Sequence, residues 1–357
     1  MSDRSTPLPP GSTIGILGGG QLGRMLSVAA SRLGYLTHIY EPGAAPAGQV
    51  AHALTQAPYA DEAALRAFAA DVDVITFEFE NVPATALDLL AETVPIRPGL
   101  DALAVSQDRL TEKTFLQGLG LATAPFRDVP DLPMLQAALE ELGTPAILKT
   151  RRLGYDGKGQ VRIVDPAEAA DAYAAMAGTD AILEGFVAFE REVSVIAARG
   201  LSGEVVCFDP GENVHQGGIL RTTTIPAELS PALRTDAALL AGRILNALDY
   251  VGVLGVELFV TPAGLLVNEI APRVHNSGHW TQAGCAVDQF EQHIRAVAGL
   301  PLGDGKRHVD VVMENLIGDD MDRLPELLAA PDTQIHLYGK AETRPGRKMG
   351  HVNRIRR

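Results

Sequence analysis

Two glutamates in the second half of the sequence are spaced so that they could share a metal ion. Residues 261–264 form a predicted turn between two apolar runs, so Glu257 falls opposite Asn268, within one residue, and beside Glu269. Two carboxylates this close repel each other unless a cation lies between them, and Mg²⁺ takes oxygen ligands of this kind. The alternative is two exposed glutamates on opposite faces, but the apolar flanks GVELFV and LLVNEIA favour burial. We therefore predict that Glu257 and Glu269 bind magnesium.

The residues that follow this hairpin are rich in hydrogen-bond donors. Arg273, His275, Asn276 and Ser277 lie within the run APRVHNSGH, and all of them can donate to a small oxyanion. A single histidine is more often a satisfied core or surface residue, but the density of donors here favours a site. The histidines do not form an H-E-x-x-H motif, so a zinc protease is not indicated. The segment predicts an anion pocket beside the metal pair.

A glycine-rich loop near the start of the chain fits a dinucleotide-binding pattern. Gly18, Gly20 and Gly23 match G-x-G-x-x-G between a predicted strand and a predicted helix, and Glu41 ends the next strand. Glycines allow backbone N–H groups at a helix N-terminus to approach a phosphate closely. The pattern alone leaves three readings open: NAD(P), another phosphate ligand, or a tight turn that serves packing.

Several basic residues could contact phosphate groups. Arg109 and Lys113 are four residues apart and share one helical face, while Lys149 ends an apolar strand. All three could instead be solvated charges, and no P-loop motif is present. Residues 340–357 carry seven basic residues and one glutamate. This basic segment is either a solvated end of the chain or a second anion site.

The elements that must position these residues form two kinds of unit. Strands at Thr13–Leu17, 37–40 and 72–77 alternate with helices at 21–33 and 63–70. This βαβαβ rhythm predicts a doubly wound parallel sheet.

A second unit is predicted to begin after the PIRPG stretch at residues 95–99. It opens with a helix near 106–116, and the strand Ala146–Thr150 runs into the glycine-rich loop 154–159. The hairpin around residues 261–264 distinguishes this unit from the parallel one and indicates a mixed α+β fold. Its other predicted elements are strands at 161–164, 193–198 and 205–208, and helices at 167–176, 231–248 and 288–298.

Composition sets limits on the class of protein. The chain has 357 residues, of which 46% are hydrophobic and 21% charged, enough for two or three domains with sizeable cores. Its net charge of −14 argues against broad nucleic-acid binding. Two distant cysteines, Cys207 and Cys285, exclude a disulfide scaffold and fit a reducing compartment. No apolar run approaches a membrane span, and MSDRSTPLPPG does not read as a secretory signal. We therefore expect a cytoplasmic protein with neither nucleic-acid nor membrane partners.

Taken together, these motifs resemble the ATP-grasp superfamily and, within it, the N5-carboxyaminoimidazole ribonucleotide synthetase family. The resemblance covers about residues 12–353, leaving out the first ten residues and the short C-terminal end. Its markers are GILGGGQLGRM (15–25), TFEFENVP (76–83), DRLTEK (108–113), GYDGKGQ (154–160), LEGFV and REVSV (183–195), ENVHQGGIL (212–220), GVELF (255–259), NEIAPRVHNSGHWT (268–281), and HLYGK and RPGRKMGH (336–351).

The resemblance implies an ATP-grasp fold in several parts. These are a flexible leader (1–11), a doubly wound pre-ATP-grasp domain (12–105), an ATP-grasp domain (106–300) with its lid at about 125–190, and a small C-terminal domain with a basic end (301–357). The glycine loop would then belong to a domain that binds a ribonucleotide rather than NAD, which overturns the fingerprint reading.

The family's reaction joins ATP, bicarbonate and 5-aminoimidazole ribonucleotide, and yields the N5-carbamate, ADP and phosphate through carboxyphosphate. The resemblance further implies ATP and Mg²⁺ as cofactors, a homodimer, and hand-off of the labile product to a downstream mutase. Three other hypotheses stay open: an NAD(P)-dependent oxidoreductase, an ATP-grasp ligase with a different acceptor, and a non-catalytic nucleotide sensor.

The resemblance also implies roles for individual residues. Glu257 and Glu269, with Asn268 beside them, would bind Mg²⁺. The remaining residues on the ATP side would be phosphate contacts (Arg109, Lys113, Lys149), the adenine hinge (Glu184, Val187), the ribose acceptor (Glu192) and a further ATP contact (His215).

The acceptor side follows from the same resemblance. Arg273, His275 and Asn276 would form the bicarbonate pocket. Contacts to the aminoimidazole ribonucleotide would come from Glu78, Tyr155 and Asp156, and clamps on its 5′-phosphate from Lys340, Arg347 and Lys348, assisted by Gln21.

Overall fold

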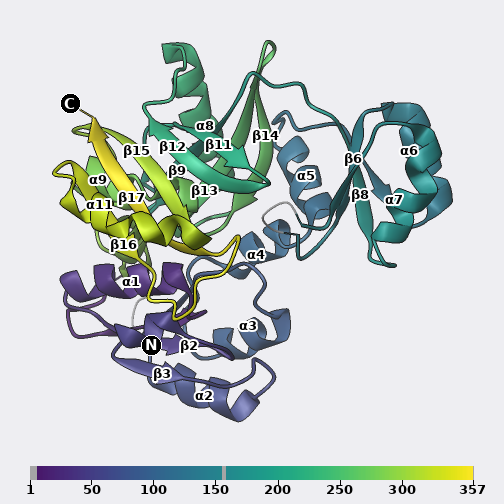
Figure 1. Ribbon diagram of the computed structural model, residues 1–357. Helices are drawn as coiled ribbons and strands as arrows, with labels where there is room; N and C mark the ends of the chain where they lie inside the picture. The colour runs from purple at the N-terminus through teal and green to yellow at the C-terminus, as the bar shows by residue number, and fades with distance from the viewer. Residues whose placement is uncertain (1–5, 155–157, 357) are drawn as a thin grey trace.

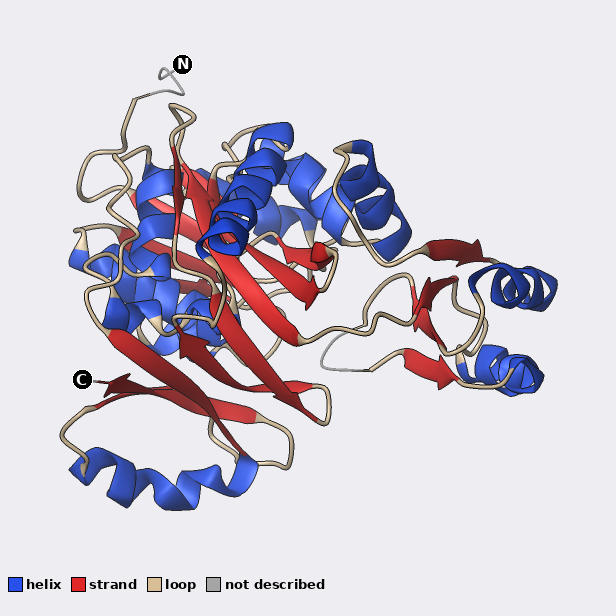
Figure 2. Cartoon of the chain, turned by 90° about the horizontal axis from the view of Figure 1, so that it is seen from above, coloured by secondary structure: helices blue, strands red, loops and turns tan. Residues whose placement is uncertain are grey.

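The computed structural model describes residues 6–154 and 158–356, which form three sheets with their covering helices (Figure 1). A four-stranded parallel sheet opens the chain. A small antiparallel sheet follows, and a nine-stranded sheet contains the remaining strands. Both views show the small antiparallel unit projecting from the rest of the molecule (Figure 2). The predicted succession of a doubly wound unit and a mixed α+β remainder is confirmed.

The first sheet has the strand order β3-β2-β1-β4, with all neighbours parallel. Strand β1 lies between β2 and β4, so the loops that follow β1 and β4 meet at one edge of the sheet. The three predicted strands are confirmed, while the three-residue β3 has too little pattern to be predicted. The elements of this unit are β1 (Thr13–Leu17), α1 (Gln21–Arg32), β2 (Leu36–Tyr40), η1 (Pro46–Gln49), β3 (Ala53–Thr55), α2 (Glu62–Ala70), β4 (Val74–Phe77) and α3 (Ala84–Ala91).

The helix predicted near residues 106–116 corresponds to α5 (Arg109–Gly118), and a separate short helix, α4 (Leu100–Ser106), precedes it. The break occurs at Asp108, whose side chain accepts hydrogen bonds from the first N–H groups of α5 and so caps that helix. The cap fixes where α5 begins, which places Arg109 in its first turn.

The projecting unit is an antiparallel sheet in the order β5-β8-β6-β7, covered by helices α6 and α7. Its core is small and separate, and includes Leu135, Leu139 and Leu148. The elements are β5 (Phe126–Val129), α6 (Leu132–Leu142), β6 (Ala146–Thr150), β7 (Gln160–Ile163), η2 (Pro166–Glu168), α7 (Ala169–Ala175) and β8 (Ala181–Gly185).

The large sheet runs in the order β14-β13-β9-β11-β12-β15-β17-β16, and β10 pairs with β9. Side chains of β9 alternate between its faces: Val195 packs in the core with α8, and Ile196 in the core with α10. The two helices therefore cover opposite faces. The elements are β9 (Arg191–Arg199), β10 (Val205–Cys207), β11 (Gly211–Gln216), β12 (Ile219–Ile225), α8 (Pro231–Ala247), β13 (Gly252–Thr261), β14 (Gly264–Ala271), η3 (Asn276–Gly278), α9 (Thr281–Gly284) and α10 (Gln289–Ala298).

The last strands of the chain continue this same sheet. Strand β15 pairs with β12 on one side and β17 on the other, so the sheet is continuous across residue 301. The domain boundaries stay a prediction, but the pairing explains how the basic C-terminal segment reaches the hairpin region. The final elements are β15 (Asp310–Ile317), η4 (Gly318–Arg323), α11 (Leu324–Ala329), β16 (Thr333–Leu337) and β17 (Lys348–Arg356).

Candidate active site

The two glutamates of the hairpin are directly opposed. Beyond the two-residue turn, a β-bulge between Glu257 and Leu258 shifts the register, so that Glu257 pairs with Glu269 rather than with Asn268. Burial, together with the charge of Glu269, raises the pKa of Glu257 to about 7. Burial acts in the same direction on Glu269, but Arg109 outweighs it and lowers the pKa of that carboxyl to about 2. Two opposed carboxylates and a nearby amide are a donor set that suits Mg²⁺.

Helix α5 brings two cations, Arg109 and Lys113, to this pair. The Arg109 Nη1 lies 2.9 Å from Glu269 Oε2, and Lys113 Nζ donates to the backbone oxygen of Asn268 at 3.3 Å. Lys113 is only 1% exposed, because its charge is paired with Glu184 at 3.3 Å.

Glu184 joins the projecting unit to this cluster. Its carboxylate also accepts from Lys149 Nζ at 2.9 Å. Burial acts to raise the pKa of Glu184, but the two lysines lower it overall. Arg109, Lys113 and Lys149, which the sequence left open as solvated charges, therefore converge near one buried carboxylate.

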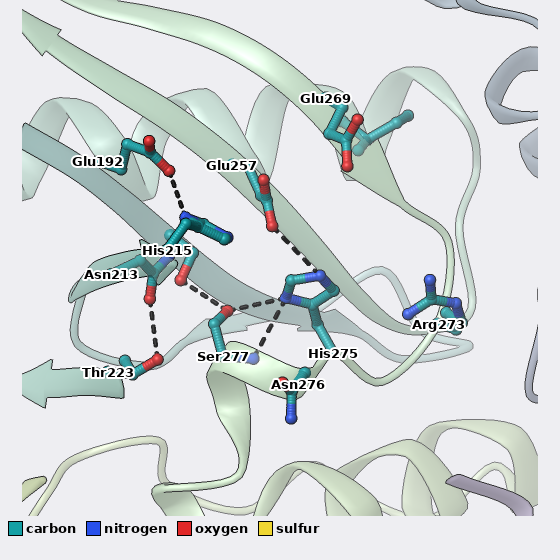
Figure 3. Close-up of polar contacts among 12 residues, drawn as sticks. Glu192, Asn213, His215, Thr223, Glu257, Glu269, Arg273, His275, Asn276 and Ser277 are labelled. Atoms are coloured by element: carbon teal, nitrogen blue, oxygen red, sulfur yellow. Dashed lines mark hydrogen bonds and ion pairs between the residues drawn. The ribbon is translucent and has the colours of Figure 1, made fainter. Parts of the chain in front are cut away.

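The predicted adenine and ribose residues lie along the same edge. Glu192 on β9 and His215 on β11 form an ion pair, with 2.6 Å between Glu192 Oε2 and His215 Nδ1 (Figure 3). Burial acts to lower the pKa of His215, but Glu192 raises it overall. Val187 is half-buried in the loop after β8.

His275 projects from the donor-rich segment toward Glu257 of the glutamate pair (Figure 3). Its Nε2 is 3.4 Å from Glu257 Oε1, and its Nδ1 is 2.8 Å from Ser277 Oγ, which also contacts Ser194 Oγ at 2.7 Å. Burial and the Arg273 charge lower the pKa of His275 to about 3. The ring is therefore neutral at pH 7 and can serve as a hydrogen-bonding group.

Two side chains that the sequence did not single out hold this segment. Gln289 accepts from the His275 N–H at 2.9 Å and donates to its C=O at 2.8 Å. Asn276 and Asn315 exchange amide hydrogen bonds of 2.9 and 2.6 Å. Neither partner lies in a motif with chemical meaning, and β15 is distant in sequence, so only the fold reveals them.

The glycine loop donates its N–H groups to the chain's own carboxylates. The Gly20 and Gly23 N–H groups bond to Glu78, the latter at 2.6 Å, and the Gly19 N–H bonds to Glu41 at 2.9 Å. Burial raises the pKa of Glu78. A bound phosphate would compete for these donors, so the loop does not favour dinucleotide binding. Gln21, the first residue of α1, is half-buried beside this arrangement.

Among the C-terminal basic residues, Lys340 and Arg347 are bonded to backbone oxygens of their own segment, whereas Lys348 lies near the anion pocket. Lys340 Nζ donates to the Lys348 backbone oxygen at 2.7 Å and lies 5.6 Å from the Tyr338 ring centroid, while Arg347 donates to Glu342 O at 2.9 Å. The charge of Lys348 acts on the pKa of both His215 and His275, so this end of β17 is near the anion pocket. The predicted contacts Tyr155 and Asp156 lie outside the described residues.

Comparisons with known proteins assign this arrangement to a class. Residues 12–107 match the ribonucleotide synthetase preATP-grasp domain, residues 114–290 the ATP-grasp domain, and residues 311–357 the phosphoribosylaminoimidazole carboxylase C-terminal domain. The fold and the site define an ATP-dependent ligase of the ATP-grasp class, which uses ATP with Mg²⁺.

Relatives of the whole chain narrow that class. The N5-carboxyaminoimidazole ribonucleotide synthase of Brucella melitensis is 60% identical over 355 residues, 98% of each chain. The crystal structure of the Thermus thermophilus synthetase has a TM-score of 0.91 at 48% identity, covering 96% of this chain and 93% of that one. An Aspergillus clavatus enzyme, solved in complex with ADP and 5-aminoimidazole ribonucleotide, has a TM-score of 0.91 at 31% identity, covering 97% and 94%. The chain belongs to the N5-carboxyaminoimidazole ribonucleotide synthetase family of purine biosynthesis.

Proposed function

We propose that this ligase carboxylates 5-aminoimidazole ribonucleotide with the residues described above, using ATP and bicarbonate. The observation that carries the proposal is the direct opposition of Glu257 and Glu269, with the α5 cations on one side and the donors around His275 on the other. A pair of metal-binding carboxylates between a phosphate-binding cluster and an oxyanion pocket suits phosphoryl transfer to a small anion.

On the ATP side, Glu257, Glu269 and Asn268 would hold Mg²⁺, which neutralises phosphate charge when bound. Lys113 and Lys149 would contact the phosphates, with Arg109 beside Glu269. The adenine would meet Glu184 and Val187, and the ribose Glu192 and His215.

The acceptor side completes the reaction. A bicarbonate oxygen attacks the γ-phosphorus and ADP leaves, which gives carboxyphosphate. The ribonucleotide amine then bonds to the carboxyl carbon as its C–O bond to phosphate breaks, and the departing phosphate takes the amine proton. Arg273, His275 and Asn276 would orient the oxyanion. No side-chain general base is required by this scheme.

The ribonucleotide would lie between the glycine loop and the basic C-terminal segment. Glu78 and Gln21 would approach it from the first sheet, together with Tyr155 and Asp156 from the loop after β6. Lys340, Arg347 and Lys348 would bind its 5′-phosphate, which suits a dianionic ester.

The proposal extends to the location, the oligomeric state and the domain division of the protein. No helix within residues 6–154 and 158–356 is long and apolar enough to cross a membrane. We further propose a cytoplasmic homodimer that passes its labile carbamate to a mutase, and a division of the chain into the domains predicted above. Sedimentation of the purified protein tests the dimer.

The experiment that tests the function is ADP release from Mg-ATP, with bicarbonate and 5-aminoimidazole ribonucleotide each omitted in turn. We expect release to need the ribonucleotide, and labelled bicarbonate to enter an acid-labile product. Turnover with a different acceptor alone would preserve the class and overturn the substrate. NADH binding without use of ATP would restore the oxidoreductase hypothesis.

A further inference from the structure

A half-buried ion pair joins the end of the first sheet to the anion pocket. Glu80 follows β4, and Arg273 follows β14. Glu80 Oε2 accepts from Arg273 Nε at 2.5 Å, and Oε1 accepts from Nη2 at 3.1 Å. The two side chains are 29% and 19% exposed. The sequence motifs contained Glu80 but gave it no role, because its partner is 193 residues away.

The geometry of this pair leaves one side of the guanidinium open. Glu80 occupies the side that carries Nε and one N–H of Nη2, and a third N–H, on Nη1, donates to Val274 O at 3.3 Å. A guanidinium has five N–H donors in a fixed plane. Among the residues that the structure describes, the remaining two, one on Nη1 and one on Nη2, have no hydrogen-bond partner. Donors on two neighbouring nitrogens can bind two oxygens of a carboxylate-like anion.

Glu80 is itself held in place. Its backbone oxygen accepts from Gln107 Nε2 at 2.7 Å, and the same amide reaches Val82 O at 3.0 Å. Burial acts to raise the pKa of Glu80, but Arg273 lowers it overall, so the carboxylate is charged at neutral pH. A fixed anion beside an anion pocket weakens the pocket's electrostatic attraction. The Glu80 carboxylate is useful at this position if the orientation of the Arg273 guanidinium matters more for binding than the net positive charge of the pocket.

We propose that Glu80 is a positioning residue for bicarbonate: by binding one side of Arg273, it directs the Nη1–Nη2 edge at the oxyanion. This inference rests on the proposed function, in which Arg273 contacts bicarbonate. Glu80 itself touches no substrate in this scheme and acts through the guanidinium. It also fixes the distance between the first sheet, which would bind the ribonucleotide, and the segment that would bind the carboxyl donor.

The test compares steady-state kinetics of Glu80→Gln with those of the native enzyme. We expect KM for bicarbonate to rise about tenfold, with KM for ATP within about twofold. A merely structural role would change all substrates together. Glu291→Gln is the matched control, because Glu291 is a buried glutamate on α10 that pairs with Arg32 of α1 at 3.1 Å and Arg295 at 2.8 Å. We expect this control to leave KM for bicarbonate unchanged.

Two further variants keep the inference falsifiable if Glu80→Gln folds poorly. Glu80→Asp keeps the charge but shortens the side chain. A positioning role predicts a higher KM for bicarbonate in this variant, whereas a purely electrostatic role predicts an unchanged KM. In an Arg273→Lys background, the Glu80→Gln change should add less than twofold, since a residue that acts through Arg273 has nothing left to orient.

The outcomes distinguish failure of the proposed function from failure of the positioning role of Glu80. If the native enzyme shows no bicarbonate-dependent ADP release, the proposed function fails. If the native enzyme is active, but Glu80→Gln leaves KM for bicarbonate unchanged or lowers it, only the positioning role is overturned. Additive effects of the two substitutions would overturn it as well, because Glu80 would then act by another route.

Discussion

The glycine loop and the β13–β14 hairpin are both built from groups that suit charged ligands, yet they treat those groups in opposite ways. In the glycine loop, N–H groups at the start of α1 are bonded to Glu78, and the N–H of Gly19 to Glu41. In the hairpin, Glu257 and Glu269 face each other as like charges. A region that satisfies its own polar groups has gained stability, whereas one that opposes like charges has given up stability for ligand binding. The more recognisable motif is therefore not the better indicator of the ligand.

The largest effect is expected from Glu257→Gln. Losing one metal carboxylate should lower kcat at least about a thousandfold. Relief of repulsion between the opposed carboxylates should at the same time raise the melting temperature of the metal-free protein by about 2–4 °C. Calorimetry without metal and ADP release with Mg-ATP measure the two effects. Loss of activity together with a lower melting temperature would contradict the contrast drawn between the two regions.

Glu78→Gln tests the opposite case. The amide keeps one acceptor but turns an NH₂ group toward buried N–H donors, so we expect a loss of about 1–3 kcal/mol in the free energy of unfolding. Because Glu78 would also contact the ribonucleotide, kcat/KM for that substrate should fall about tenfold or more. Urea denaturation gives the first quantity. As a control, Glu62→Gln changes an exposed glutamate in the same domain, and an equal loss there would remove any special role for the glycine loop.

Lys340→Ala tests whether the ribonucleotide phosphate is bound by a side chain docked next to the first sheet rather than by the glycine loop. Gln49 next to the loop donates to the Gly339 oxygen at 3.0 Å, which docks the Lys340 segment against the first sheet. We expect KM for the ribonucleotide to rise about tenfold and kcat to change less. Exposed Lys306→Ala is the control. An unchanged KM in Lys340→Ala would show that the phosphate is bound elsewhere.

How far the sequence could predict these regions depends on the range of the interactions. The strands around the glycine loop and the Glu257–Glu269 neighbourhood follow from local periodicity and turn chemistry, which short segments encode. The bulge that brings Glu257 opposite Glu269 lies in a strand that also pairs with β9, a contact that the turn does not encode.

Contacts between distant segments were not accessible from spacing. The Glu78 cap on α1, the Glu80 pair with Arg273 and the Asn276–Asn315 exchange each join separate elements. Lys113 could be placed on a helix face, but nothing local indicated that this cation would be buried against Glu184. Residue types predicted the chemistry, whereas the tertiary fold determines which groups remain available for it.

A change in pH-dependent stability is expected at His293, which joins β4 of the first sheet to β13 of the hairpin. Its Nδ1 accepts from the Val253 N–H at 3.0 Å, and its Nε2 contacts Thr76 Oγ1 at 2.7 Å. Burial lowers the pKa of His293 to about 3, below the value of about 6.5 in an unfolded chain. Protons therefore bind the unfolded state more readily, so the stability from the neutral ring is present above pH 6.5 and declines as the pH falls toward 3.

Between pH 7 and pH 5 the loss in the free energy of unfolding should be about 2 kcal/mol. His293→Gln should remove that share of the pH dependence in urea denaturation, while exposed His308→Gln should not. An unchanged pH dependence in His293→Gln would mean that the pKa of the ring is the same in the folded and unfolded chains, and that the contact between β4 and β13 does not depend on its neutral form.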